Sequence, residues 1–170
     1  MSEFITPPYE ITQPDNPPVF LAGPVQGTID WQAKVAESII SSSSHSVSVI
    51  SPRGSAELYR HPSPWLDDGK QTPWEKRHLL LARDRGILAM WMAAQSFETP
   101  GRAFAQTSRI EFGRIAGWVD YNPEVQFVFG IDPQYQGGNA TYFREVCEEL
   151  ALPVQTTLDD WSAAIASRLS

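Results

Sequence analysis

Short apolar runs bounded by turn residues recur along the chain at intervals that suit buried strands. The first, Val19-Phe20-Leu21-Ala22, is ended by Gly23-Pro24. A continuous apolar run of this length between turn signals is typical of a strand covered on both faces. The same pattern predicts further strands over residues 47–50, 87–91, 125–129 and 152–154.

Between these runs, apolar residues repeat with the spacing of an amphipathic helix. Trp31, Val35 and Ile39 fall on one face of a helix over residues 30–42 that Asp30 can cap. The same reasoning predicts helices over residues 73–83, 108–120, 141–150 and 158–169. Strands that alternate with helices predict an α/β fold, with a five-stranded, mainly parallel sheet and helices on both faces.

Length and composition indicate one globular domain. The chain has 170 residues, of which 42% are hydrophobic and 19% charged, and that balance suits a single packed core. Residues 1–18 contain five prolines and are predicted to form an extended arm before a domain over residues 19–170. The arm could lie on the domain or on a partner subunit.

Charge and cysteine content exclude several classes of function. The net charge of -7 argues against binding a nucleic-acid polymer, which needs a basic surface. A single cysteine and three scattered histidines offer no metal-ligand spacing, and no dinucleotide or phosphate-loop glycine motif is present. No apolar run is long enough for a membrane span, and no signal peptide is recognisable. We therefore expect a cytoplasmic protein with no membrane partner and no cofactor.

In a parallel sheet the ligand is expected at the carboxyl ends of the strands. The loops that follow the first four strands are therefore the candidates, over residues 23–29, 51–72, 92–107 and 130–140. Gly23-Pro24 could let a ligand approach the backbone, or could be an ordinary strand-to-helix turn. Asp84 is predicted at the opposite edge of the sheet, away from these loops.

Two glutamates are predicted near the starts of helices that face this edge. An ionised carboxylate such as Glu111 can act as a nucleophile toward an anomeric carbon. Alternatively, Ser108-x-x-Glu111 is a capping box, in which the glutamate only satisfies a backbone N–H. Glu75 could be an acid–base group or the capping glutamate of a helix with Thr72 as its N-cap.

Indole rings and one arginine are further candidates for holding a flat or anionic ligand. Trp31, Trp65 and Trp74 are predicted at or beside the ligand edge, where an indole can stack a heterocycle. Packing in the core or at its rim is the alternative for each. Arg53, just after the second strand, could pair with a phosphate or could be a surface charge.

Several blocks of the chain, in order, resemble nucleoside 2-deoxyribosyltransferase-like proteins. The resemblance rests on the first strand with Gly23-Pro24 and Asp30-Trp31-Gln32, on Pro73-Trp74-Glu75, on residues 82–91, on residues 107–113 around Glu111, and on the tail from Tyr135 to Val154. Phe20 stands where the characterised transferases place a tyrosine whose hydroxyl orients the nucleophile.

This resemblance implies a flavodoxin-like three-layer sandwich. It further implies that Glu111 attacks C1′ of a nucleoside to form a glycosyl-enzyme, that an acid in the Glu75 region helps the base to leave, and that Asn139 contacts the sugar. Family members are dimers or larger homo-oligomers, so one is expected here.

The expected function is cleavage of an N-glycosidic bond, or base exchange, on a nucleoside, deoxynucleoside or nucleoside 5′-monophosphate. Transferase and hydrolase remain open. One alternative is a module that binds nucleosides or nucleotides without turnover. Another is a flavodoxin-like protein that binds a different ligand such as a flavin.

Overall fold

A computed structural model describes residues 1–54, 69–98, 100–101 and 103–169. Trp65 and most of the loop predicted over residues 51–72 lie outside these ranges. The described strands are β1 (Glu3–Ile5), β2 (Pro18–Ala22), β3 (Ser48–Ile50), β4 (Ile87–Met92), β5 (Gln126–Ile131) and β6 (Val154–Gln155). The helices are α1 (Trp31–Ser42), α4 (Gln71–Arg85), α5 (Gln106–Tyr121), α6 (Ala140–Glu149) and α7 (Leu158–Ala166).

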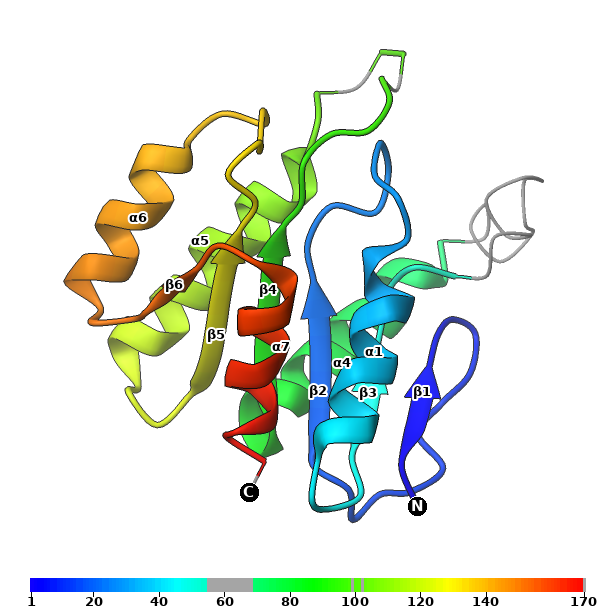
Figure 1. The fold of residues 1–170 in the computed structure, drawn as a ribbon. Coiled ribbons are helices and arrows are strands. Elements are labelled where there is room, and N and C mark those ends of the chain that lie inside the picture. Colours follow the sequence, from blue (N-terminus) through cyan, green and yellow to red (C-terminus); the bar gives the residue numbers. More distant parts are fainter. Residues whose placement is uncertain (55–68, 99, 102, 170) are drawn as a thin grey trace.

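The strands form one sheet in the order β1-β3-β2-β4-β5-β6, and every described pair in it is parallel. Helices α1 and α7 cover one face, while α4, α5 and α6 cover the other (Figure 1). The fold is therefore a flavodoxin-like three-layer α/β sandwich, as predicted. The sheet has six described strands, however, instead of the predicted five.

The additional strand, β1, comes from the segment predicted as an extended arm. Glu3, Phe4 and Ile5 pair in parallel with β3, and the Ile5 side chain is buried. The Glu3 carboxylate accepts hydrogen bonds from the backbone N–H and hydroxyl of Thr12 and from the hydroxyl of Ser48. The arm is thus fixed along the edge of its own domain.

Both faces of the sheet are packed with large apolar side chains. Successive residues of β2 alternate between the layers, with Val19 and Leu21 against α1 and α7 and with Phe20 on the α4 and α5 side. This alternation follows from the period of two along a strand. The apolar runs of the sequence are continuous because helices cover the sheet on both sides.

Helix starts show one confirmed cap and one error of prediction. Asp30 caps α1, where its side chain accepts a hydrogen bond from the Ala33 N–H. Thr72 does not cap α4, because that helix begins earlier, at Gln71, and follows Lys70. Pro73 can be accommodated in the first turn because the N–H groups there have no partner within the helix.

Candidate active site

The order of the strands defines where a ligand pocket is expected. The chain passes from β2 outward to β3 and then returns past β2 to β4, so the strand order reverses between β2 and β4. Ligands of open α/β sheets bind outside the carboxyl ends of the strands at such a reversal. The two loops that leave this point are joined, since the N–H groups of Ser96 and Phe97 both donate to the Gly27 carbonyl.

Gly23 and Pro24 form the turn at the end of β2. Gly23 has a φ of +139°, and a side chain there would collide with the Trp91 carbonyl of β4. The Pro24 carbonyl accepts hydrogen bonds from the indole N–H of Trp31 at 3.0 Å and from the hydroxyl of Thr28 at 3.1 Å. The glycine is therefore required for the close approach of the two central strands, and the turn is held by its own loop.

Arg53 lies just beyond β3 and binds the loop that follows β2. Its guanidinium donates to the side-chain oxygen of Gln32 at 3.0 Å and to the Val25 carbonyl at 2.6 Å. It also donates to the Thr28 hydroxyl at 2.8 Å and to the Ile29 carbonyl at 3.1 Å. Only 14% of its side chain is exposed. These contacts show an arginine that shapes the edge of the site by fixing a loop.

Glu75 and Glu111 occupy equivalent places on neighbouring helices. Each lies in the second turn of its helix, α4 or α5, and both helices pack on the same face of the sheet. Both start from the carboxyl edge, since each follows a strand or its loop in a parallel sheet. The fold therefore brings the two predicted carboxyl groups to one corner of the site, beside the reversal of strand order.

The capping-box interpretation of these glutamates is wrong. Helix α5 begins at Gln106 and follows Ala105, so Ser108 is a buried residue of its first turn and no N-cap. Glu75 accepts a hydrogen bond at 2.7 Å from the side-chain amide of Gln71, one turn earlier. Neither carboxyl group is used by a helix terminus, and both are available for other chemistry.

Burial raises the pKa of both carboxyl groups, and the charge of Glu75 adds to this effect at Glu111. The pKa of Glu111 is raised to about 7. Burial is the largest cause and the negative charge of Glu75 adds to it, whereas the positive charge of Arg114 lowers the pKa. Burial also raises the pKa of Glu75, while the hydrogen bond from Gln71 lowers it. Two coupled carboxyl groups titrate as a unit, so the pair retains one proton up to near-neutral pH.

Two of the three candidate indoles lie in the core. Trp31 is 2% exposed and meets Trp161 edge-on at 5.7 Å between ring centroids. Trp74 is 1% exposed, donates its N–H to the Tyr9 carbonyl at 2.8 Å and packs against His78 at 4.1 Å. These two rings are core packing and do not offer an open face for stacking a base.

Asn139 lies on the loop after β5, which is fastened to the start of α5. It is exposed, has a φ of +63° and directly precedes α6. Arg109 of α5 donates to the Gly137 carbonyl of this loop at 2.6 Å. This contact fastens the Asn139 loop to the first turn of α5, the helix that carries Glu111.

Sequence reasoning missed three residues in this part of the structure. Gln71 donates a hydrogen bond to Glu75, Arg109 binds the Asn139 loop, and Arg114 lowers the pKa of Glu111. Arg109 and Arg114 flank Glu111 in the sequence, and Gln71 is one helical turn before Glu75. Spacing of three or four along a helix could have found Gln71 and Arg114, because such residues share a face.

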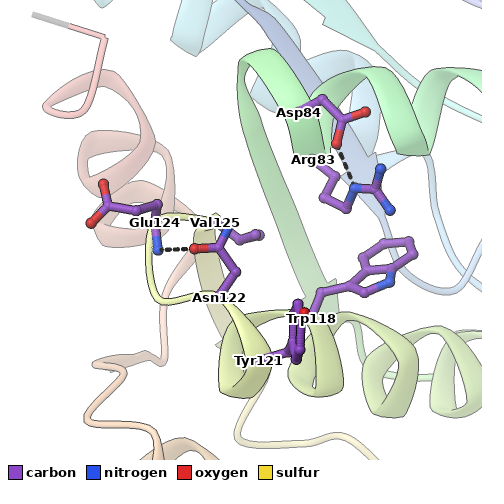
Figure 2. Close-up of a pocket in the computed structure, with 7 residues that line it drawn as sticks. All are labelled: Arg83, Asp84, Trp118, Tyr121, Asn122, Glu124 and Val125. Carbon is purple, nitrogen blue, oxygen red and sulfur yellow. Dashed lines mark hydrogen bonds and ion pairs between the residues drawn. The ribbon is translucent and has the colours of Figure 1, made fainter.

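A separate shallow depression of about 390 Å³ lies at the opposite edge of the sheet. Figure 2 shows Arg83 and Asp84 of α4 on one side of it and Trp118 of α5 on the other. The guanidinium groups of Arg83 and Arg114 lie 5.1 and 4.6 Å from the Trp118 ring centre. The contact of Arg83 with Trp118 joins the far ends of α4 and α5, whereas that of Arg114 lies within α5. Asp84 lies at this edge, as predicted.

A scan of protein-family models and a search of curated proteins find no match to this sequence. Within the described ranges, no three histidine, cysteine or acidic side chains lie together in a way that could hold a metal ion. None of the helices in the same ranges combines the length and apolar character needed to cross a membrane.

Proposed function

We propose that the protein cleaves the N-glycosidic bond of a nucleoside, deoxynucleoside or nucleoside 5′-monophosphate, or exchanges its base. The observation that carries the proposal is the coupled pair of Glu75 and Glu111 at the strand-order reversal. Two carboxyl groups that share one proton supply the nucleophile and the acid that retaining glycosidases use. The resemblance to nucleoside 2-deoxyribosyltransferase-like proteins supports the choice of a nucleoside as substrate.

In the first step, the ionised Glu111 attacks C1′ of the sugar. The C1′–O bond to Glu111 forms while the C1′–N bond breaks, and the electron pair of that bond leaves with the base. Glu75 gives its proton to the departing base and becomes ionised. The reactive form is the arrangement of the singly protonated pair in which Glu75 holds the proton.

In the second step, water or an acceptor base attacks C1′ of the glycosyl-enzyme. Glu75 takes the proton of the incoming group, and the electron pair of the ester bond returns to Glu111. Water as acceptor makes the protein a hydrolase, and a second base makes it a transferase. The Asn139 loop and the Gly23-Pro24 turn are proposed to contact the sugar, and the protein is proposed to act in the cytoplasm as a homo-oligomer.

A chromatographic assay tests this proposal. Purified protein is offered nucleosides, deoxynucleosides and their 5′-monophosphates, with and without a free acceptor base. We expect product from the wild type and none from Glu111→Gln, and a rate about 10²- to 10⁴-fold lower from Glu75→Gln. Glu148→Gln, an exposed change on α6, is the matched control. Undiminished turnover by Glu111→Gln would remove that residue from the mechanism.

One observation favours a second candidate, a module that binds nucleosides without turnover. Phe20 is buried in the core of the α4 and α5 layer and carries no hydroxyl with which to orient Glu111. Saturable binding of a nucleoside in calorimetry, together with no product from the whole panel, would select this candidate over the enzyme.

A further inference from the structure

One side-chain amide ties the Glu75 carboxyl group to the end of β3. Gln71 is the first residue of α4, and its amide nitrogen donates to Glu75 Oε1 at 2.7 Å and to the Pro52 carbonyl at 3.3 Å. Pro52 lies two residues beyond Ile50, the last residue of β3, and Glu75 is one turn into α4. The amide therefore links the two elements that border this side of the site.

The chemistry of these three groups fixes which way the amide points. A backbone carbonyl can only accept a hydrogen bond, so the nitrogen of the amide must face Pro52. That nitrogen has two hydrogens, and the second one is directed to Glu75. Oε1 of Glu75 consequently accepts a hydrogen bond whether the carboxyl group is neutral or ionised, and the proton of the neutral acid resides on Oε2.

We propose that Gln71 is a positioning residue of the reaction, holding Glu75 by Oε1 so that Oε2 alone exchanges a proton with the base. The inference rests on the proposed function, since it assigns the working oxygen of the proposed acid. Glu75 has to act as an acid in the first step and as a base in the second. The hydrogen bond from Gln71 stabilises the ionised form of Glu75 that exists between the two steps. Glu111 of α5 and Glu75 interact through their charges, and Arg114 opposes the effect of Glu75 on Glu111. The hydrogen bond described for the Glu75 carboxyl group comes from Gln71.

The effect of Gln71 on Glu75 can be measured without any substrate. The carboxyl carbon of Glu75 is followed by NMR over a pH titration in wild type, Gln71→Met and Lys76→Met. Methionine matches glutamine in length but cannot donate, and Lys76 is an exposed neighbour on the same helix. We expect the pKa of Glu75 to rise in Gln71→Met and to be unchanged in Lys76→Met. Gln71→Asn, whose shorter side chain retains the amide, provides a second variant that should shift in the same direction.

Leaving-group dependence then separates positioning from a general structural role. We expect Gln71→Met to lower the rate of base release from ordinary nucleosides roughly 10- to 100-fold, the loss that one hydrogen bond to a charged group gives. A nucleoside analogue whose leaving group needs no proton serves as the comparison. Its leaving group should be released in the first turnover at the wild-type rate. A structural defect would slow both substrates equally and would overturn the inference.

The two readouts distinguish failure of this inference from failure of the proposed function. An unchanged titration of Glu75 in Gln71→Met overturns the role of Gln71, whatever the wild type turns over. A shifted titration combined with no turnover by the wild type supports the hydrogen bond and refutes the proposed function. A shifted titration with selective loss on ordinary nucleosides supports both.

Discussion

Replacing Glu111 by glutamine should stabilise the protein, and the gain should appear only as the pH rises. Burial and the charge of Glu75 raise the pKa of Glu111 from an ordinary 4.5 to about 7. Glutamine has nearly the same shape and cannot ionise. The substitution therefore removes the penalty of placing a negative charge at this corner, while it leaves the packing of α5 in place.

The size and sign of the effect follow from linkage between ionisation and folding. A carboxyl group with a raised pKa in the folded state stabilises that state at low pH relative to high pH, and this advantage is lost as the pH rises through the folded value. A difference of one in pKa corresponds to about 1.4 kcal/mol, so ionising Glu111 disfavours folding by about 3 kcal/mol. The advantage of Glu111→Gln should be near zero below pH 4.5 and reach about 3 kcal/mol above pH 7.

Urea denaturation at a series of pH values, from acidic to mildly alkaline, provides the measurement. The free energy of unfolding of Glu111→Gln is compared with that of the wild type at each pH, and Glu148→Gln on α6 is the control at an exposed site. In a Glu75→Gln background the gain should be smaller, because one of the two causes of the raised pKa is gone. A difference between Glu111→Gln and wild type that stays constant with pH would refute the reasoning.

Three further substitutions have expected outcomes that the structure fixes. Arg114→Gln should raise the pKa of Glu111 further, because it removes the positive charge that lowers it; an NMR titration of the Glu111 carboxyl carbon measures this. Gly113→Ala should stabilise by about 1 kcal/mol in urea denaturation, because the glycine is a helical residue with open space where a side chain would begin. Gly23→Ala should destabilise by at least about 2 kcal/mol in the same assay, because its side chain would meet the Trp91 carbonyl from a positive φ.

The sequence predicts the layers of this fold because apolar residues follow different patterns in its strands and in its helices. The boundaries of α1 and β4 are predicted to within a residue, since caps and turn residues define them. Strand β1 is missed because three residues in a proline-rich segment carry too short a pattern. Its pairing with β3 depends on a non-local fit that no local signal reports.

At the site, the sequence predicts which carboxyl groups face the carboxyl edge but does not reveal their environment. The capping box at Ser108 and Glu111 satisfies a local rule, and only the earlier start of α5 excludes it. Arg53 has the chemistry of a phosphate ligand, yet its guanidinium donates hydrogen bonds to the loop after β2 and to Gln32 of α1. Local spacing predicts which edge of the sheet a residue faces. The groups that the residue contacts there depend on how distant segments of the chain pack.

The carboxyl pair departs from the rules that the rest of the chain follows. Elsewhere, local propensity, apolar patterning and packing agree, and agreement across levels is what makes a sequence specify one fold. Glu75 and Glu111 instead bury two like charges on adjacent helices, and each raised pKa means reduced stability at neutral pH. Glutamine at either position would relieve this without disturbing the helices. Retaining both acids at the strand-order reversal therefore makes sense for a site that needs a shared proton, which is why the pair, more than any single residue, carries the proposed chemistry.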